Sequence, residues 1–428
     1  MKFRFVLCLL MGAWSMRAAE HGAALPANAA SSLQRRVEAE LRGNILPFWL
    51  QHARDREHGG FYGQISNDLT VRKDAPRGAL LTARILWTFS AAYRHYHDPA
   101  YLEMARWAYE DLVTRLWDAE FGGVYWAIGA DGRPADARKI VYGQAFAIYG
   151  LSEFSRATGE QAPLDRAIAL YRLLERHARD RVHGGYVEEF TREWKVSPGR
   201  GRASALGSRG PKSQNVHLHL FEAYTNLLRA WPDAMLKQDL RALVDVVLAR
   251  ILDTSNSHLR LFLAEDWTPV SDTISFGHDI EAAWLLTDTA EALGDEVLRQ
   301  EVQTLAVQIA RTTLKEGVDG DGGLLAEADP SGVTNRYKEW WPQAEATVGF
   351  LNAFELSGDP AFWKATVASW MFVENHLVDR EHGEWFIGVT REGRVAAPVK
   401  VSFWKCPYHN GRACLELLDR LARQQVAR

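Results

Sequence analysis

A pair of adjacent glycines recurs at an almost constant interval, and this repeat constrains the fold more than any other feature. The first glycines of the five clear copies stand at positions 59, 122, 184, 322 and 383, and the last copy reads Gly-Glu. Successive copies are 63, 62, 138 and 61 residues apart. Because the long interval is about twice the others, a degenerate copy is predicted midway, at residues 257–262. The chain is therefore predicted to contain six similar units.

Each copy is typical of a tight turn that leads into a short strand. In four of the five clear copies an aspartate stands four residues before the first glycine: Asp55, Asp118, Asp180 and Asp379. Glycine tolerates positive φ, and an aspartate side chain supports a turn by accepting hydrogen bonds from nearby backbone amides. Alternating apolar and polar residues after the glycines predict short β-hairpins.

Amphipathic helical periodicity flanks every hairpin, so the chain is predicted to be all-α. The predicted helices cover residues 33–53, 78–97, 99–117, 142–158, 162–178, 214–230, 235–253, 277–293, 296–314, 341–356, 360–377 and 407–424. Six such pairs form either an open solenoid or a closed (α/α)6 barrel with hairpins at one mouth. The second helix of each pair is the better inner candidate, because segments such as 79–93 and 277–286 are apolar on nearly all faces.

The N-terminus is typical of a secretory signal. Lys2 and Arg4 precede an apolar run that is too short to span a bilayer, and small residues follow it. Residues 1–24 are therefore interpreted as a signal peptide and 25–428 as a single catalytic domain. This predicts a periplasmic or secreted protein without membrane attachment after processing, or a cytoplasmic one if the segment is not a signal. Residues 192–213, rich in Gly, Ser, Arg and Pro, are predicted to form a long loop, either a surface insertion or a lid.

Composition narrows the classes of function. Lys plus Arg number 50 and Asp plus Glu 54, so no basic excess exists to neutralise phosphates, and nucleic-acid binding is disfavoured. The chain has only three cysteines, which cannot build a disulfide framework. Sixteen tryptophans suit a site that stacks on sugar rings, although most of them can equally belong to the core.

Polar side chains cluster at the starts of the predicted inner helices, just after the hairpins, and should converge on one mouth. The candidates are Arg84, Tyr142, Asn215, His219, His278, Glu281, Trp341, Glu345, Trp404 and His409. Helix N-termini point partial positive charge at this mouth, which stabilises an oxyanion and favours neutral histidine. A neutral imidazole is a competent general base.

Each candidate also has a plainer interpretation. A single histidine on an inner helix is usually a hydrogen-bonded core residue, and His217 and Glu222 are expected to serve structural or supporting roles. Trp340, Trp341 and Trp404 are core aromatics or sugar platforms. A metal could also be bound by the set His219, His278, Glu281 and His409. The sequence has no HxxxH or HExxH pair to support such a site, so no metal or cofactor is expected.

Several segments containing these residues resemble the N-acylglucosamine 2-epimerase superfamily and, within it, the cellobiose 2-epimerase group. They read APRG, NVHLH, SFGHDIE, WWPQAE and FWKCPYHNGR, beginning at residues 75, 215, 275, 340 and 403. The resemblance covers about residues 33–425. It implies an (α/α)6 barrel without a required metal or nucleotide cofactor, acting on a disaccharide.

The resemblance also implies a reaction and residue roles. Glucose and mannose interconvert at the reducing end of a β-1,4-linked disaccharide through ring opening, C2 deprotonation and a cis-enediolate. The implied acid/base residues are His278 and His409, and His219 with Asn215 assists ring opening. Arg84 stabilises the enediolate, Glu281 orients His278 or contacts substrate, and Glu345 plays a similar role. Trp341 and Trp404 stack on the sugars, and Tyr142 is a lesser contact.

Other functions remain open on the same residues. An aldose–ketose isomerase would return the proton to C1, and a monosaccharide or N-acylglucosamine 2-epimerase would lack a second sugar subsite. A glycoside hydrolase would use Glu281 and Glu345 as flanking carboxylates, which leaves the histidines without a role. A non-catalytic glycan binder would tolerate loss of His278 and His409. A monomer is expected.

Overall fold

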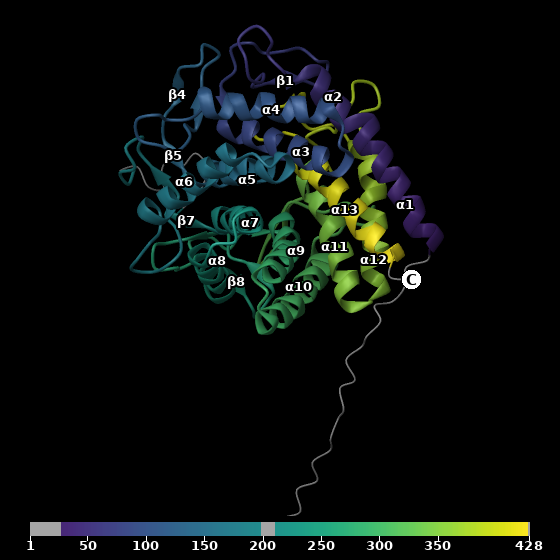
Figure 1. Ribbon diagram of the computed structural model, residues 1–428. Coiled ribbons are helices and arrows are strands. Elements are labelled where there is room, and N and C mark those ends of the chain that lie inside the picture. Colours follow the sequence, from purple (N-terminus) through teal and green to yellow (C-terminus); the bar gives the residue numbers. More distant parts are fainter. Residues whose placement is uncertain (1–26, 198–209, 427–428) are drawn as a thin grey trace, which may run out of the picture.

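The computed structural model describes residues 27–197 and 210–426. The predicted signal peptide and the centre of the predicted 192–213 loop lie outside these residues. In chain order the helices run once around the molecule, and the last helix returns to lie beside the first (Figure 1). Among the described residues, no helix combines the length and apolar character that a bilayer crossing requires.

The helices form an outer and an inner ring. The outer ring consists of α1 (Ala27–Glu40), η1 (Leu41–Ile45), α2 (Leu46–His52), α4 (Pro99–Thr114), α6 (Gln161–His177), α8 (Ala234–Val246), η2 (Val247–Ile251), α10 (Glu296–Glu316), α12 (Pro360–Phe372) and η3 (Val373–Leu377), where η marks a π-helical turn. The inner ring consists of α3 (Ala79–Tyr96), α5 (Val141–Thr158), α7 (Gln214–Ala230), α9 (Phe276–Leu293), α11 (Trp340–Ser357) and α13 (Tyr408–Val426).

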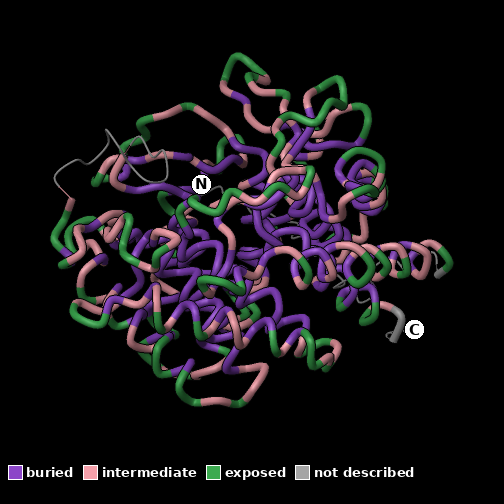
Figure 2. Tube along the Cα trace, turned by 90° about the horizontal axis from the view of Figure 1, so that it is seen from above, coloured by how far each residue is buried: buried purple, intermediate pink, exposed green. Residues whose placement is uncertain are grey.

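The inner ring is closed. Each inner helix packs against the next, and α13 packs against both α11 and α3. Every residue of α3 from Ala79 to Ala92 is buried, as its apolar sequence predicts. Figure 2 shows buried segments gathered in the interior and exposed ones mainly at the periphery. The (α/α)6 barrel is therefore confirmed, with the second helix of each pair inside, and the open solenoid is excluded.

The predicted helix ends agree with the structure to within three residues, except at the first helix. That helix begins at Ala27 rather than at residue 33. The segment that precedes the predicted start contributes Ala30 to the core, and α1 packs along α13. Tertiary packing therefore extends this helix beyond the strongest part of its amphipathic pattern.

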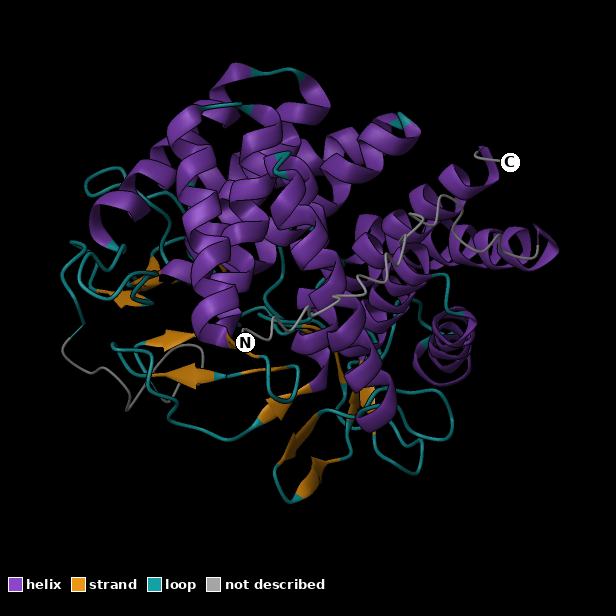
Figure 3. Ribbon diagram, turned by 90° about the horizontal axis from the view of Figure 1, so that it is seen from below, coloured by secondary structure: helices purple, strands orange, loops and turns teal. Residues whose placement is uncertain are grey.

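The short strands form a collar on one side of the helices (Figure 3). The strand before each inner helix pairs with a strand of the next unit. These pairs are β2 (Arg77–Gly78) with β3 (Ala127–Ile128), β5 (Lys139–Ile140) with β6 (Glu189–Phe190), β7 (Lys212–Ser213) with β10 (Phe262–Leu263), β11 (Ile274–Ser275) with β12 (Glu327–Asp329), β14 (Lys338–Glu339) with β15 (Gly388–Val389), and β16 (Val399–Val401) with β1 (Ile65–Ser66). The last pair joins the sixth unit to the first and closes the collar.

Three further pairings complete the collar. β4 (Pro134–Asp136) extends β3, β13 (Gly332–Asn335) extends β12, and β8 (Leu252–Asp253) pairs with β9 (His258–Leu259). The β8–β9 hairpin is the degenerate sixth copy, and Ser257 takes φ of 63° where a glycine such as Gly184 has φ of 79°. The prediction of six units with hairpins at one mouth is confirmed.

Ion pairs formed by buried cations attach the hairpin turns to the strands that precede the inner helices. Lys139 Nζ donates to Asp118 at 2.9 Å, and Lys212 Nζ donates to Asp180 at 2.8 Å. The same pairing joins Arg77 to Asp55, Lys338 to Asp321 and Lys400 to Asp379. Four of these cations stand two residues before an inner helix, and Lys400 stands eight residues before α13. These pairs hold the first turns of the inner helices against the collar, where the candidate site residues lie.

Candidate active site

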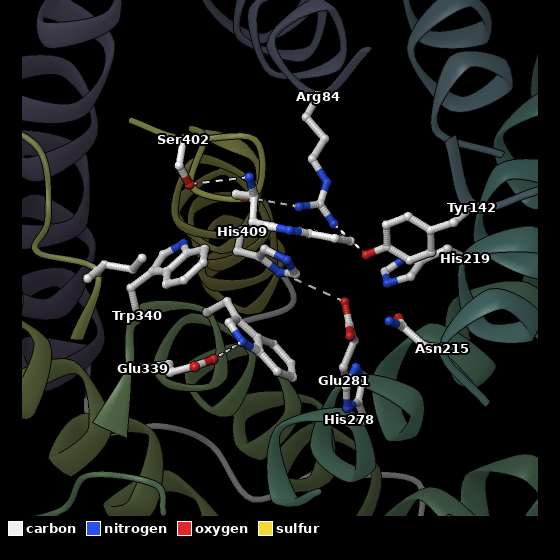
Figure 4. A pocket seen from close by; sticks show the side chains of 13 residues that line it. Arg84, Tyr142, Asn215, His219, His278, Glu281, Glu339, Trp340, Ser402 and His409 are labelled. Atoms are coloured by element: carbon white, nitrogen blue, oxygen red, sulfur yellow. Dashed lines mark hydrogen bonds and ion pairs between the residues drawn. The ribbon is translucent and has the colours of Figure 1, made fainter. Parts of the chain in front are cut away.

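A cavity of about 340 Å³ opens at the collar mouth of the barrel. Nine of the ten predicted site residues line it: Arg84, Tyr142, Asn215, His219, His278, Glu281, Trp341, Trp404 and His409. The tenth, Glu345, is completely buried and forms a hydrogen bond with His409, which lines the cavity. Figure 4 shows the labelled side chains converging from different helices. The structure thus brings together residues that are up to 325 positions apart in the sequence.

His409 is held by a carboxylate on one side of the cavity. Its Nδ1 lies 2.6 Å from Glu345 Oε1 and 3.9 Å from Glu281 Oε1. Burial lowers the pKa of His409 well below its usual range, and the guanidinium groups of Arg84 and Arg412 lower it further. The imidazole is therefore neutral at neutral pH. Among the described residues, none hydrogen-bonds its Nε2.

His278 is held by a hydroxyl. Its Nδ1 lies 2.8 Å from Ser275 Oγ, at the residue that precedes α9. Burial lowers the pKa of His278 to about 3, and the neighbouring His219 contributes to this shift. Glu281, one turn along α9, forms no hydrogen bond with His278 and instead accepts one from Arg412. Glu281 was expected either to orient His278 or to contact substrate. Since it does not bond to His278, substrate contact is the role that remains.

His219 forms a third held imidazole. Its Nδ1 lies 2.8 Å from Glu222 Oε2, and its ring packs against Tyr142 and Phe146. Burial lowers the pKa of His219, although its hydrogen bond to Glu222 acts to raise it. His217 faces away and accepts the Tyr186 backbone N–H, which is the structural role expected of it. All three cavity histidines are thus held at Nδ1, which leaves Nε2 as the atom that can exchange a proton with a ligand.

Arg412 is a buried hub beneath the cavity, and its role was missed from the sequence. Its guanidinium donates to Glu281 at 2.8 Å, to Glu345 at 2.7 Å and to Glu222. Only 1% of the residue is exposed. Its segment was part of the family resemblance, but helical periodicity shows only that it faces inward. The partners come from α7, α9 and α11, so only the packed ring reveals them.

The carboxylates around Arg412 differ in charge. Burial raises the pKa of Glu281 well above its usual range, and the nearby Glu345 raises it further. Burial also raises the pKa of Glu345, although Arg412 opposes this shift. For Glu222 the balance is reversed: burial acts to raise its pKa, but Arg412 and His219 bring it to about 2. Glu222 therefore ionises most readily of the three, and the Glu281–Glu345 pair holds a proton more tightly than ordinary carboxyl groups do.

Three of these residues could also be considered as metal ligands. Glu281, Glu345 and His409 offer ligand atoms that lie within 4.8 Å of one another. However, Arg412 donates to both carboxylates and already supplies a positive charge at this point. A divalent ion would have to share the carboxylates with that guanidinium, which disfavours this cluster as a metal centre.

Arg84 supplies positive charge to the cavity. Its Nη2 donates to Tyr142 Oη at 2.7 Å and its Nη1 to the Trp404 backbone oxygen at 3.3 Å. The guanidinium lies over the Phe146 ring, with its central carbon 4.2 Å from the ring centroid. Within residues 27–197 and 210–426, no carboxylate forms an ion pair with it. An uncompensated buried cation of this kind stabilises an anion formed in the cavity.

Aromatic side chains wall the cavity. The Trp341 ring centroid lies 4.7 Å from that of His278 and 5.5 Å from that of His409. Trp404 is 37% exposed at the rim and contacts Trp126 and Tyr142. Such indole faces suit the apolar faces of sugar rings.

Four further lining residues lie in the collar strands or directly beside them: Glu339, Trp340, Ile387 and Ser402. Trp340 was considered as a platform from the sequence, whereas the other three were missed. For Glu339 the sequence did contain a signal, namely a carboxylate one position before an inner helix.

Comparisons with known proteins give a consistent result. A family model described as N-acylglucosamine 2-epimerase (GlcNAc 2-epimerase) matches residues 60–413. A cellobiose 2-epimerase from Bacteroides fragilis is 43% identical over 388 residues, covering 90% of this chain and 98% of that protein. The solved cellobiose 2-epimerase of Bacillus thermoamylovorans B4167 has a TM-score of 0.86 at 39% identity, covering 91% of this chain and 100% of that one. The one from Spirochaeta thermophila DSM 6192 has a TM-score of 0.85 at 40% identity, covering 92% and 98%.

Proposed function

The chain belongs to the N-acylglucosamine 2-epimerase family, as a carbohydrate 2-epimerase of the cellobiose 2-epimerase type, and from this premise we propose how it acts. The substrate is a β-1,4-linked disaccharide such as cellobiose, whose reducing-end glucose is converted to mannose. One observation carries the proposal: His278 and His409 border one cavity with Nε2 free, beside the uncompensated Arg84.

Epimerisation at C2 requires that a proton leaves one face of the carbon and returns to the other. Ring opening exposes the C1 carbonyl, and His219 with Asn215 is placed in the cavity wall to assist that step. Removal of the C2 proton by an imidazole Nε2 then gives an enediolate. Its negative charge is stabilised by Arg84 and by the N-termini of the inner helices.

Two differently held histidines provide the two faces. His278, hydrogen-bonded to Ser275, can take the C2 proton and become an imidazolium. His409 can deliver a proton from Nε2 while its Nδ1 takes one from Glu345, whose pKa is raised by burial. The enediolate is then quenched to the epimer, which leaves His278 protonated and Glu345 ionised. Proton exchange with water restores the starting state, and the reverse reaction begins from the product state with the roles exchanged. Both histidines are neutral before reaction, in keeping with their lowered pKa values.

A second sugar ring is accommodated by the aromatic rim. Trp404 is partly exposed at the cavity edge and is held by Phe403 and Trp126 around it. A platform outside the acid/base groups favours a disaccharide over a monosaccharide, since a single ring would be surrounded by the residues around C2.

The test is product analysis by NMR after incubation with cellobiose in D2O, with and without EDTA. A mannose reducing end that carries deuterium at C2, formed at equal rates in both samples, supports the proposal. A ketose product would favour an aldose–ketose isomerase, and free glucose would favour a hydrolase. EDTA sensitivity would return the Glu281–Glu345–His409 cluster to consideration as a metal centre.

Two proposals concern the form of the protein. We propose export guided by residues 1–24, which mass spectrometry of the protein from a native host would test by finding or not finding the cleaved N-terminus. We also propose a monomer, which sedimentation would test. Both rest on the sequence reasoning alone.

A further inference from the structure

Glu339 is a cavity carboxylate that the proposed reaction does not use. It is the last residue of β14, where it pairs with Gly388 of β15, and it directly precedes α11. Its Oε2 accepts a hydrogen bond from the Trp341 indole N–H at 2.5 Å, marked by the dashed line from Glu339 in Figure 4. Among the described residues, no lysine or arginine forms an ion pair with it. The carboxylate is therefore committed to the indole rather than to charge neutralisation.

Trp341 is the part of the cavity wall that touches both acid/base histidines. Its ring lies 4.7 Å from His278 and 5.5 Å from His409, measured between centroids, at interplanar angles of 52° and 42°. A rotation of the indole would therefore disturb both imidazoles at once. Since His278 belongs to α9 and His409 to α13, the Trp341 ring from α11 is the side chain that spans the gap between them.

The opposite edge of the indole packs closely against Gly277, which has no side chain. A Cβ added to Gly277, the residue before His278, would lie 2.6 Å from Trp341 Cη2. Real Cβ atoms do not approach so closely, so the ring can occupy this position only beside glycine. The indole is thus held by a hydrogen bond at its N–H and by close packing on Gly277 at its far edge.

We infer that Glu339 and Gly277 are positioning residues that set the Trp341 ring and, through it, the placement of His278 relative to His409. The inference rests on the proposed two-histidine reaction. Two-face proton transfer depends on this relative placement, whereas removal of a proton by one histidine depends on that histidine alone. Loosening the indole should therefore impair inversion at C2 more than exchange of the C2 proton.

The experiment separates these two steps. Purified full-length variants are incubated with cellobiose in D2O, and NMR measures deuterium at C2 of the recovered glucose form and of the mannose form. In Glu339→Ala, formation of the mannose form should fall by about 10²-fold, with a smaller fall in deuterium exchange into the glucose form. Glu339→Gln retains an oxygen that accepts the indole N–H, so it should restore most of the inversion. Gly277→Ala should reproduce the Glu339→Ala pattern.

A double-mutant cycle and a matched control identify the route. Trp341→Phe removes the N–H donor, so adding Glu339→Ala to it should cause no further change in the ratio of inversion to exchange. Glu327→Gln removes another carboxylate near Glu339 that, among the described residues, forms no hydrogen bond with Trp341, and it should behave as wild type. Parallel loss of inversion and exchange, or additive effects in the cycle, would overturn the inference.

The outcome is distinguishable from failure of the proposed function. If the wild-type protein neither exchanges nor inverts the C2 proton of any disaccharide, the proposed reaction is wrong. The same four variants of the cycle are therefore also unfolded in urea. If the shifts in unfolding midpoint of the two single variants do not add up to that of the double variant, Glu339 and Trp341 are coupled, independently of activity. Additive shifts would overturn the coupling.

Discussion

Replacing Arg412 with leucine should destabilise the protein strongly and in a pH-dependent way. The guanidinium is 1% exposed and is the shared donor to Glu222, Glu281 and Glu345. Removing one partner of a buried ion pair costs about 3–5 kcal/mol, because the remaining charge is left buried and unpaired. Glu222 is the carboxylate that suffers most, since Arg412 is the strongest influence that keeps its pKa low.

The pH dependence follows from the raised pKa values. Burial already raises the pKa of Glu281 and Glu345, and loss of Arg412, which lowers both, raises them further. A carboxyl whose folded pKa exceeds its unfolded value costs stability above the unfolded pKa, and this cost disappears as pH falls toward about 4. The loss of unfolding free energy in Arg412→Leu, relative to wild type, should therefore be largest near pH 8 and shrink toward pH 5.

Urea unfolding followed by circular dichroism at both pH values measures the deficit. Arg420→Leu is the matched control, because Arg420 is also buried on α13 but pairs with Glu355 and Glu416, remote from the cavity. It should lose stability yet keep wild-type turnover, whereas Arg412→Leu should lose both. A deficit below about 1 kcal/mol for Arg412→Leu, or one equal at the two pH values, would refute the reasoning.

Three further outcomes are expected. His278→Ala and His409→Ala should bind cellobiose in calorimetry yet lose about 10²–10⁴-fold in kcat, and near-normal turnover in both would contradict two-base transfer. Arg84→Met should lower kcat by about 10²–10³-fold with a smaller change in KM, and the reverse split would argue against enediolate stabilisation. Lys139→Met should lower the free energy of unfolding by about 3–5 kcal/mol, whereas Lys195→Met, at an exposed position, should lower it by less than about 0.5 kcal/mol. Equal losses would contradict a stabilising role for the collar ion pairs.

Much of the site could be located from the sequence because its residues occupy equivalent places in a repeat. His219, Glu281 and Glu345 are each the sixth residue of an inner helix, and Arg84 is the sixth residue of α3. Repeated units place equivalent positions at equivalent heights, so polar residues at these positions had to meet once the ring was closed.

The interactions within the site were less accessible. The sequence left open whether Glu281 orients His278, but the structure shows Ser275 beside His278 and Arg412 beside Glu281. Helical periodicity states which residues face the axis, but not which neighbour each one reaches, because that depends on the rotation and offset of adjacent helices. The collar cations, such as Lys139, were also missed, because helical periodicity does not describe a strand residue whose partner, Asp118, lies in a turn 21 residues earlier.

What the sequence by itself determined is local and periodic: six turns with glycine or its substitutes, twelve helices with apolar faces, and polar residues at the starts of the inner ones. These follow from short-range backbone preferences and from the period of hydrophobic burial. Only the tertiary structure decided that the ring closes, through β1 against β16 and α3 against α13. It also decided the assembly of Arg412 with three carboxylates, because that network joins helices up to 190 residues apart and forms only when all of them are packed.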